Sequence, residues 1–208
     1  MPRSTANKHQ EKSLATRNKL FRAALDVFSR DGFEAARIED IAVEAGFTRG
    51  AFYAHFPSKE DLFFALLEEE MQRHVERIRH ELQKCPDEEA RVRTFREFFV
   101  KRAADRAWSI LTLEFKLYAI RHPHIRAQLV RSYRSIRDKM KFEALWQNAF
   151  CREGGFESTE KLLLQAALNG LVLQRAYDPA SLSAAELGSL LGGLFDYVVA
   201  SSPPRPVR

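Results

Sequence analysis

The sequence contains few cysteines, glycines and prolines, and it has no long apolar run. Its two cysteines, Cys85 and Cys151, lie far apart without metal-ligand spacing, so we expect free thiols in a reducing compartment and no metal site. Nine glycines and eight prolines in 208 residues argue against a loop-rich, all-β or disordered chain. No apolar run reaches the roughly 18 residues of a membrane span, and the polar N-terminus lacks a secretory signal. We therefore expect a cytoplasmic protein without a membrane partner.

The positive charge is concentrated at the start of the chain. The net charge is +5, and the first 22 residues hold six basic residues against Glu11 alone, so their excess equals that of the whole chain. Such a charge permits a polyanionic partner without requiring one. Hydrophobic residues make up 45% of the sequence, which is enough for a sizeable core.

The apolar spacing predicts helices throughout and no convincing strand. Glycine, proline and capping residues punctuate the pattern. The expected fold class is all-α, with helices near residues 13–30, 38–45, 49–55, 58–84, 87–104, 107–121, 123–152, 159–176 and 183–200.

Residues 38–62 hold the most specific pattern, two short helices joined by a tight turn. Gly46 supplies the backbone freedom that such a turn needs. Thr48 can cap the second helix through its side-chain oxygen. Pro57 cannot continue that helix, and Ser58 can start a new one. This is a helix-turn-helix, whose second helix enters a DNA major groove.

Residues 16–67 resemble the DNA-binding domain of the TetR family of transcriptional repressors. The family pattern is present in order and with the right spacing, in Gly32-Phe33, Asp40-Ile41-Ala42, Ala45-Gly46, Gly50, Phe52-Tyr53, His55-Phe56 and Lys59-Glu60. The resemblance implies a nine-helix fold with an N-terminal DNA-binding domain and a C-terminal helical bundle that binds ligand and dimerises. The expected division is a disordered basic arm (1–12), the DNA-binding domain (13–60), the bundle (61–200) and a loose tail (201–208).

The start of the second short helix is expected to contact base edges. Arg49 could donate two hydrogen bonds to guanine O6 and N7. Gly50 would let the helix backbone approach the DNA closely, and Ala51 could offer a methyl contact to thymine. The predicted DNA-binding set is Arg37, Thr48, Arg49, Gly50, Ala51, Tyr53, His55 and Lys59.

The phosphate contacts in that set follow from the resemblance. It implies that Tyr53 and His55 bind phosphates, and Lys59 starts the next helix, whose amides would meet the same phosphate. For Tyr53 the alternative is a packing role, for His55 a structural or solvated one, and for Lys59 an ordinary solvated charge.

The sequence departs from the family at Ala36 and Arg37, where hydroxyl residues are usual. The helix that follows therefore lacks a hydroxyl cap, which costs about 1 kcal/mol. We hypothesise that Arg37 contacts a phosphate instead. The basic N-terminal segment is either an ordinary solvated tail or a second DNA contact, through Lys8, Lys12, Arg17 and Lys19.

The last two helices, 159–176 and 183–200, are strongly apolar, and 183–200 has few partners left in its own chain. A two-fold partner would cover both, forming a four-helix interface. A dimer would hold two reading helices about 34–36 Å apart, as a palindromic operator requires. The predicted interface residues are Leu164, Leu168, Leu171, Leu187, Leu191, Leu194, Phe195 and Val198.

Aromatic side chains crowd the other bundle helices. They could form a plain core, but the resemblance implies a cavity for a mostly apolar inducer. Glu114, Gln165 and Asn169 are the polar candidates on apolar faces, either as ligand anchors or as core and interface hydrogen bonds. The predicted pocket set is Phe99, Trp108, Leu111, Glu114, Phe115, Tyr118, Trp146, Gln165 and Asn169.

These patterns predict a dimeric repressor that a small-molecule ligand releases from a palindromic DNA operator. Two alternatives stay open, a constitutive or architectural DNA-binding dimer and a helical small-molecule carrier. The basic residues of 123–152 form either a solvated face or a site for an acidic ligand such as an acyl-CoA phosphate. No nucleophile–base set, phosphate loop or metal cluster stands out, so we expect no enzyme activity, no cofactor and no metal.

Overall fold

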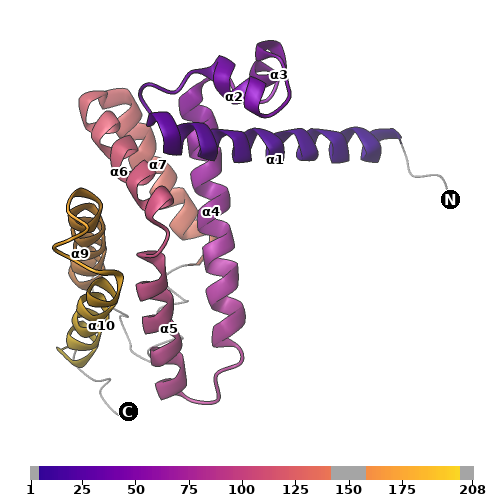
Figure 1. The fold of residues 1–208 in the computed structure, drawn as a ribbon. Coiled ribbons are helices and arrows are strands. Elements are labelled where there is room, and N and C mark those ends of the chain that lie inside the picture. The colour runs from indigo at the N-terminus through magenta and orange to yellow at the C-terminus, as the bar shows by residue number, and fades with distance from the viewer. Residues whose placement is uncertain (1–4, 142–157, 202–208) are drawn as a thin grey trace. The chain divides into compact units, whose positions relative to one another are not determined.

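The computed structural model describes the backbone of residues 5–141 and 158–201 and the side chains of residues 11–141 and 159–200. Nine helices and no strand lie in these ranges, which confirms the predicted all-α class (Figure 1). The helices are α1 (Thr5–Asp31), α2 (Ile38–Glu44), α3 (Arg49–Tyr53), α4 (Lys59–Leu82), α5 (Glu88–Arg102), α6 (Arg106–Arg121), α7 (Pro123–Lys139), α9 (Ser158–Tyr177) and α10 (Ala184–Ser201). None of these described helices is long and apolar enough to cross a membrane.

The chain forms two compact units. The first contains Met1–Glu69 and Glu114–Leu129, and the second contains Glu70–Leu113 and Val130–Arg208. Helices α4, α6 and α7 therefore each contribute residues to both units. The sequence predicts a boundary between the DNA-binding domain and the bundle after residue 60, whereas the first compact unit continues along α4 to Glu69. The assignment of a function to each part stays a prediction.

Helix α1 starts earlier than predicted. It begins at Thr5, so residues 5–12, which we expected to form a disordered arm, are helical. One side of the helix is buried, with Leu20, Ala24 and Val27 fully covered. The helix ends at Asp31, and the φ of +78° at the following Gly32 lies in the left-handed region that favours glycine.

An aromatic cluster forms the centre of the first unit. The rings of Phe63 and Phe115 stack with centroids 3.7 Å apart, and Phe33 meets Phe115 edge-on at 4.6 Å. All three side chains are fully buried. The second half of α6 thus supplies a core residue to the unit that contains the helix-turn-helix.

Two polar side chains of α6 also bond within this unit. The Glu114 carboxylate accepts a hydrogen bond from the backbone N–H of Phe33 at 2.9 Å. The Tyr118 hydroxyl donates to the Glu60 carboxylate on α4 at 2.8 Å. Burial and this hydrogen bond raise the pKa of Tyr118 to about 12. Helix α6 therefore fixes both the turn after α1 and the first turn of α4.

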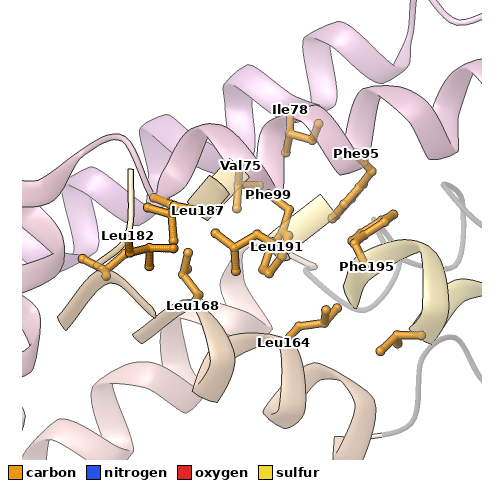
Figure 2. Close-up of a cluster of buried hydrophobic side chains, with 13 residues drawn as sticks. Val75, Ile78, Phe95, Phe99, Leu164, Leu168, Leu182, Leu187, Leu191 and Phe195 are labelled. Atoms are coloured by element: carbon orange, nitrogen blue, oxygen red, sulfur yellow. The ribbon is translucent and has the colours of Figure 1, made fainter. Parts of the chain in front are cut away.

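A second core lies in the second unit, between α4, α5, α9 and α10 (Figure 2). Figure 2 shows Leu164 and Leu168 of α9 facing Leu191 and Phe195 of α10, with Phe99 of α5 beside them. Leu191 and Phe195 have no exposed surface. Each buried leucine or phenylalanine contributes about 1.5–3 kcal/mol through removal from water.

Helix α10 packs against α5, and Gly192 on α10 lies next to the Arg96 side chain of α5. A methyl group at Gly192 would come within 2.7 Å of the Arg96 guanidinium carbon. The Arg96 Nε donates to both oxygens of Asp196, at 2.8 and 2.9 Å. The Arg96 guanidinium therefore lies over Gly192 and binds the carboxylate of Asp196, one turn further along α10.

Candidate nucleic-acid interface

Helices α2 and α3 pack against each other, and α2 also contacts α1. Ile41, Ala42 and Phe52 are fully buried and hold the pair in place. Between the helices Gly46 adopts a φ of +75°, which confirms the predicted role of glycine in the turn. The Thr48 hydroxyl accepts a hydrogen bond from the Ala51 N–H at 3.2 Å and caps α3, as predicted.

The outer face of α3 is exposed and carries the predicted base-contacting residues. Arg49, Gly50 and Tyr53 all lie on the surface. A methyl group at Gly50 would meet only the Thr48 Oγ1, at an ordinary 3.8 Å. Glycine in a helix costs about 1 kcal/mol relative to alanine. None of the described residues around this position requires glycine, and the close approach to DNA expected there stays a prediction.

Arg49 is held by two neighbours. Its Nη1 lies 2.7 Å from the Glu39 carboxylate on α2, and its Nη2 lies 3.4 Å from the Tyr53 hydroxyl. The guanidinium also sits 5.5 Å from the centre of the Tyr53 ring. The hydrogen bond with Tyr53 and the charge of Glu39 raise the pKa of Arg49. The side chain thus has a defined position while 61% of it stays exposed.

Lys59 makes contacts within its own unit. Its Nζ donates to the carbonyl oxygens of Glu34 and Ala36, each at 2.9 Å, and lies 4.8 Å from the centre of the Phe33 ring. Burial lowers the pKa of the amine. An ammonium has three N–H donors, so one remains for a phosphate. The phosphate contact of Lys59 stays a prediction, beside a structural role that the sequence did not reveal.

Arg37 precedes α2 without capping it, as expected from the missing hydroxyl. Its side chain is 73% exposed, and its Nε lies 4.0 Å from Glu39. In the basic α1 segment, Arg17 and Lys19 lie over aromatic rings, with the Arg17 guanidinium 5.0 Å from the Phe21 centroid. His55 is half-buried. Phosphate contacts of these residues remain predictions.

The residues predicted for the ligand pocket fall into different parts of the molecule. Glu114, Phe115 and Tyr118 belong to the first unit, where each has the partner described above. The others with described positions, Phe99, Trp108, Leu111, Gln165 and Asn169, belong to the second unit. Trp146 lies outside the described residues. The Gln165 amide donates to the Asn169 side chain at 2.9 Å. These two residues and Glu114 therefore form hydrogen bonds within the chain, which was the alternative to binding a ligand.

The residues predicted for the dimer interface have partners within the chain itself, and their contact with a second chain stays a prediction. They lie in the core of Figure 2, where Leu164, Leu168, Leu187, Leu191, Phe195 and Val198 are buried and Leu171 and Leu194 pack against them. The apolar spacing correctly indicated a buried stripe on each helix. It could not show that other helices of the same chain cover these stripes. The large apolar side chains that α9 and α10 leave exposed are Leu162, Leu163, Leu173, Tyr177, Leu190 and Tyr197.

Glu39 is the partner of Arg49 that sequence reasoning missed. It lies in the first turn of α2, where an acidic side chain is expected to interact with the helix dipole. The sequence offers no sign of its contact with Arg49, because only the fold brings together two residues that are ten positions apart.

A short helix-turn-helix with an exposed, arginine-led second helix defines a DNA-binding transcriptional regulator. Residues 20–66 match the model of the bacterial regulatory proteins of the tetR family. The HTH-type transcriptional regulator CymR of Pseudomonas putida is 30% identical over 144 residues, which cover 69% of this chain and 70% of that protein. The chain belongs to the TetR family.

Two further comparisons extend over most of the chain. The fatty acid metabolism regulator protein of Bacillus subtilis strain 168 is 24% identical over 179 residues, covering 83% of this chain and 92% of that protein. The crystal structure of the regulator FadR from Bacillus subtilis in complex with stearoyl-CoA matches with a TM-score of 0.62 and 20% identity. It covers 89% of this chain and 98% of that one, and it shows a shared fold.

Proposed function

We propose that the protein is a dimeric repressor that leaves a palindromic operator when a small, mostly apolar ligand binds to its second unit. The observation that carries the proposal is the exposed face of α3. Arg49 is held in position and Gly50 has no structural reason to lack a side chain, so this face is built for close approach to bases.

The exposed apolar faces of α9 and α10 support a dimer. On α9, Leu162, Leu173 and Tyr177 recur at helical spacing on one side, and Tyr177 is 84% exposed. Gly170 on α9 and Gly193 on α10 have open space around them, so a partner helix could approach closely. Several exposed apolar side chains on one side of a helix are typical of a protein–protein contact. We therefore assign the dimer interface to these faces, in place of the buried residues predicted from the sequence.

Helix α6 supports a route by which ligand could weaken DNA binding. Its first half belongs to the second unit, and its second half supplies Glu114, Phe115 and Tyr118 to the first. Those residues fix the turn after α1 and the first turn of α4. A ligand that favours a different position of α6 would disturb both contacts, and operator affinity would fall with the population of the DNA-binding state.

The ligand class follows from the apolar, aromatic second unit and from the relative described above. Long-chain acyl groups suit an apolar site, and Arg131, Arg134 and Arg137 on α7 are exposed cations that suit the phosphates of coenzyme A. Stearoyl-CoA, free stearate and free coenzyme A are therefore the first probes. Together they separate the apolar from the anionic contribution.

The test is a fluorescence anisotropy titration of the full chain on DNA from upstream of its own gene, at stated salt. We expect saturable binding that Arg49→Ala weakens at least tenfold, and release by stearoyl-CoA. Binding of wild type that no bound ligand alters would contradict ligand release and favour the constitutive DNA-binding dimer. Failure to bind any such DNA would favour the small-molecule carrier.

The dimer is tested by sedimentation of Leu173→Glu. A carboxylate on an apolar contact face should convert dimer to monomer. The matched control is Leu117→Glu on α6, which places the same charge at an equally exposed leucine of the first unit. Dissociation by both variants, or by neither, would contradict the assigned interface.

A further inference from the structure

The ion pair between Glu39 and Arg49 joins the two helices of the DNA-binding motif at their outer ends. Glu39 lies in the first turn of α2, and Arg49 is the first residue of α3. Their 2.7 Å contact is exposed on both sides, so it adds at most about 1 kcal/mol to stability. A weak surface pair is a poor explanation for a carboxylate on a face that must meet phosphates.

A carboxylate in this place opposes binding to DNA in general. It faces a polyanion, and it occupies part of the arginine that would bind bases. Arg37 lies on its other side, with the Nε 4.0 Å from Glu39 Oε2. The carboxylate thus lies between two arginines predicted to contact DNA, where it would contribute something other than affinity.

The pair matches the major-groove edge of one base pair. Guanine presents two acceptors, N7 and O6, and its cytosine presents the N4 amino donor beside them. Arginine supplies donors for guanine, and glutamate accepts from cytosine N4. A carboxylate has about four lone-pair sites. Arg49 lies against Oε1, and Arg37 lies 4.0 Å from Oε2, beyond hydrogen-bond distance, so Oε2 can still accept from a base. An A·T pair would place the thymine O4 acceptor against the carboxylate.

We propose that Glu39 and Arg49 together recognise one G·C base pair, with Arg49 donating to guanine and Glu39 accepting from the paired cytosine. Glu39 is then a specificity-determining residue that lowers affinity for other sequences. The proposal rests on the proposed function, because it assumes that α3 enters the major groove. Tyr53 keeps the guanidinium in place from the other side.

The test is selection from a pool of random-sequence duplexes by the full chain, followed by affinities for duplexes that differ at one base pair. Wild type should select a G·C pair at one position and discriminate there by about 5- to 150-fold. Glu39→Ala and Arg49→Ala should each lose preference at that same position. The double variant should lose no more than Arg49→Ala alone, because the two residues act as a unit.

Glu44→Ala is the control, since it removes the same charge from the same short helix at an exposed position away from Arg49. It should retain the full preference. Circular dichroism of all variants separates loss of recognition from loss of fold.

The outcomes separate the two proposals. Full preference in Glu39→Ala would overturn the role of Glu39 while leaving a sequence-specific regulator intact. Loss in Glu39→Ala with full retention in Arg49→Ala would overturn the joint recognition. Selection of no sequence by wild type would overturn the proposed function itself.

Discussion

The two units use their apolar and polar residues in different ways. In the first unit, residue identity indicates role, because Gly46, Thr48 and Arg49 each serve a local demand of the turn, the cap or the exposed helix start. In the second, Leu190 and Leu191 are the same residue at adjacent positions, yet one is exposed and the other fully buried. Local chemistry can therefore be inferred from sequence, while the partner of an apolar stripe depends on the fold.

The largest expected effect separates those two leucines. Leu191→Ala should lower the free energy of unfolding by about 2–5 kcal/mol, because it leaves a cavity in the core. Leu190→Ala should change monomer stability by no more than about 0.5 kcal/mol and weaken the dimer instead. Urea unfolding and sedimentation of both variants check this. Equal losses of stability would remove the distinction between core and interface on α10.

Tyr118→Phe should have an intermediate effect in the first unit. It removes the hydroxyl that bonds to Glu60, at a cost of about 1.5 kcal/mol. The pKa of Tyr118 is raised from 10.0 to about 12, so the folded state holds this proton more tightly. Its contribution is complete below pH 10 and is lost as pH rises towards 12.

Wild type should therefore lose stability more steeply than Tyr118→Phe over that alkaline range, as thermal unfolding would show. Parallel curves would mean that the hydrogen bond contributes nothing. Such a result would show that the first unit also depends on a contact between helices far apart in sequence, because Tyr118 lies on α6 and Glu60 on α4.

The two helix caps of the motif predict smaller changes of opposite sign. Thr48→Ala removes the cap of α3 and should cost about 1 kcal/mol, whereas Arg37→Ser adds a hydroxyl where α2 has none and should gain up to about 1 kcal/mol. Arg37→Ser should also flatten the slope of log affinity against log salt by about one unit. An unchanged slope would leave Arg37 without a phosphate contact.

The smallest effect is expected at Gly50. Gly50→Ala should stabilise α3 by about 0.5–1 kcal/mol, because alanine is the better helix residue and has room. The same methyl group should reduce DNA affinity if the backbone approaches the bases there. Urea unfolding and fluorescence anisotropy on one preparation measure the stability gained and the DNA affinity lost. A gain in both would contradict close approach at this position.

The parts of the site that the sequence revealed are those fixed within a few residues. The turn at Gly46 and the cap at Thr48 depend on neighbours only. The contacts of Glu114 and Lys59 join segments far apart in the chain, so spacing could not reveal them. Periodicity also identified the apolar stripes of α9 and α10, but burial inside the chain or against a partner gives the same pattern.

The crossing of Arg96 over Gly192 links two positions that are distant in the sequence. A side chain at 192 would meet the Arg96 guanidinium, which ends a flexible, part-exposed side chain and can move aside. That movement would leave Asp196 without its arginine, a loss of no more than about 1 kcal/mol for an exposed ion pair. In a library of variants, small residues at 192 should therefore be tolerated, and changes at 96 and 196 should be found more often beside them than beside Gly192.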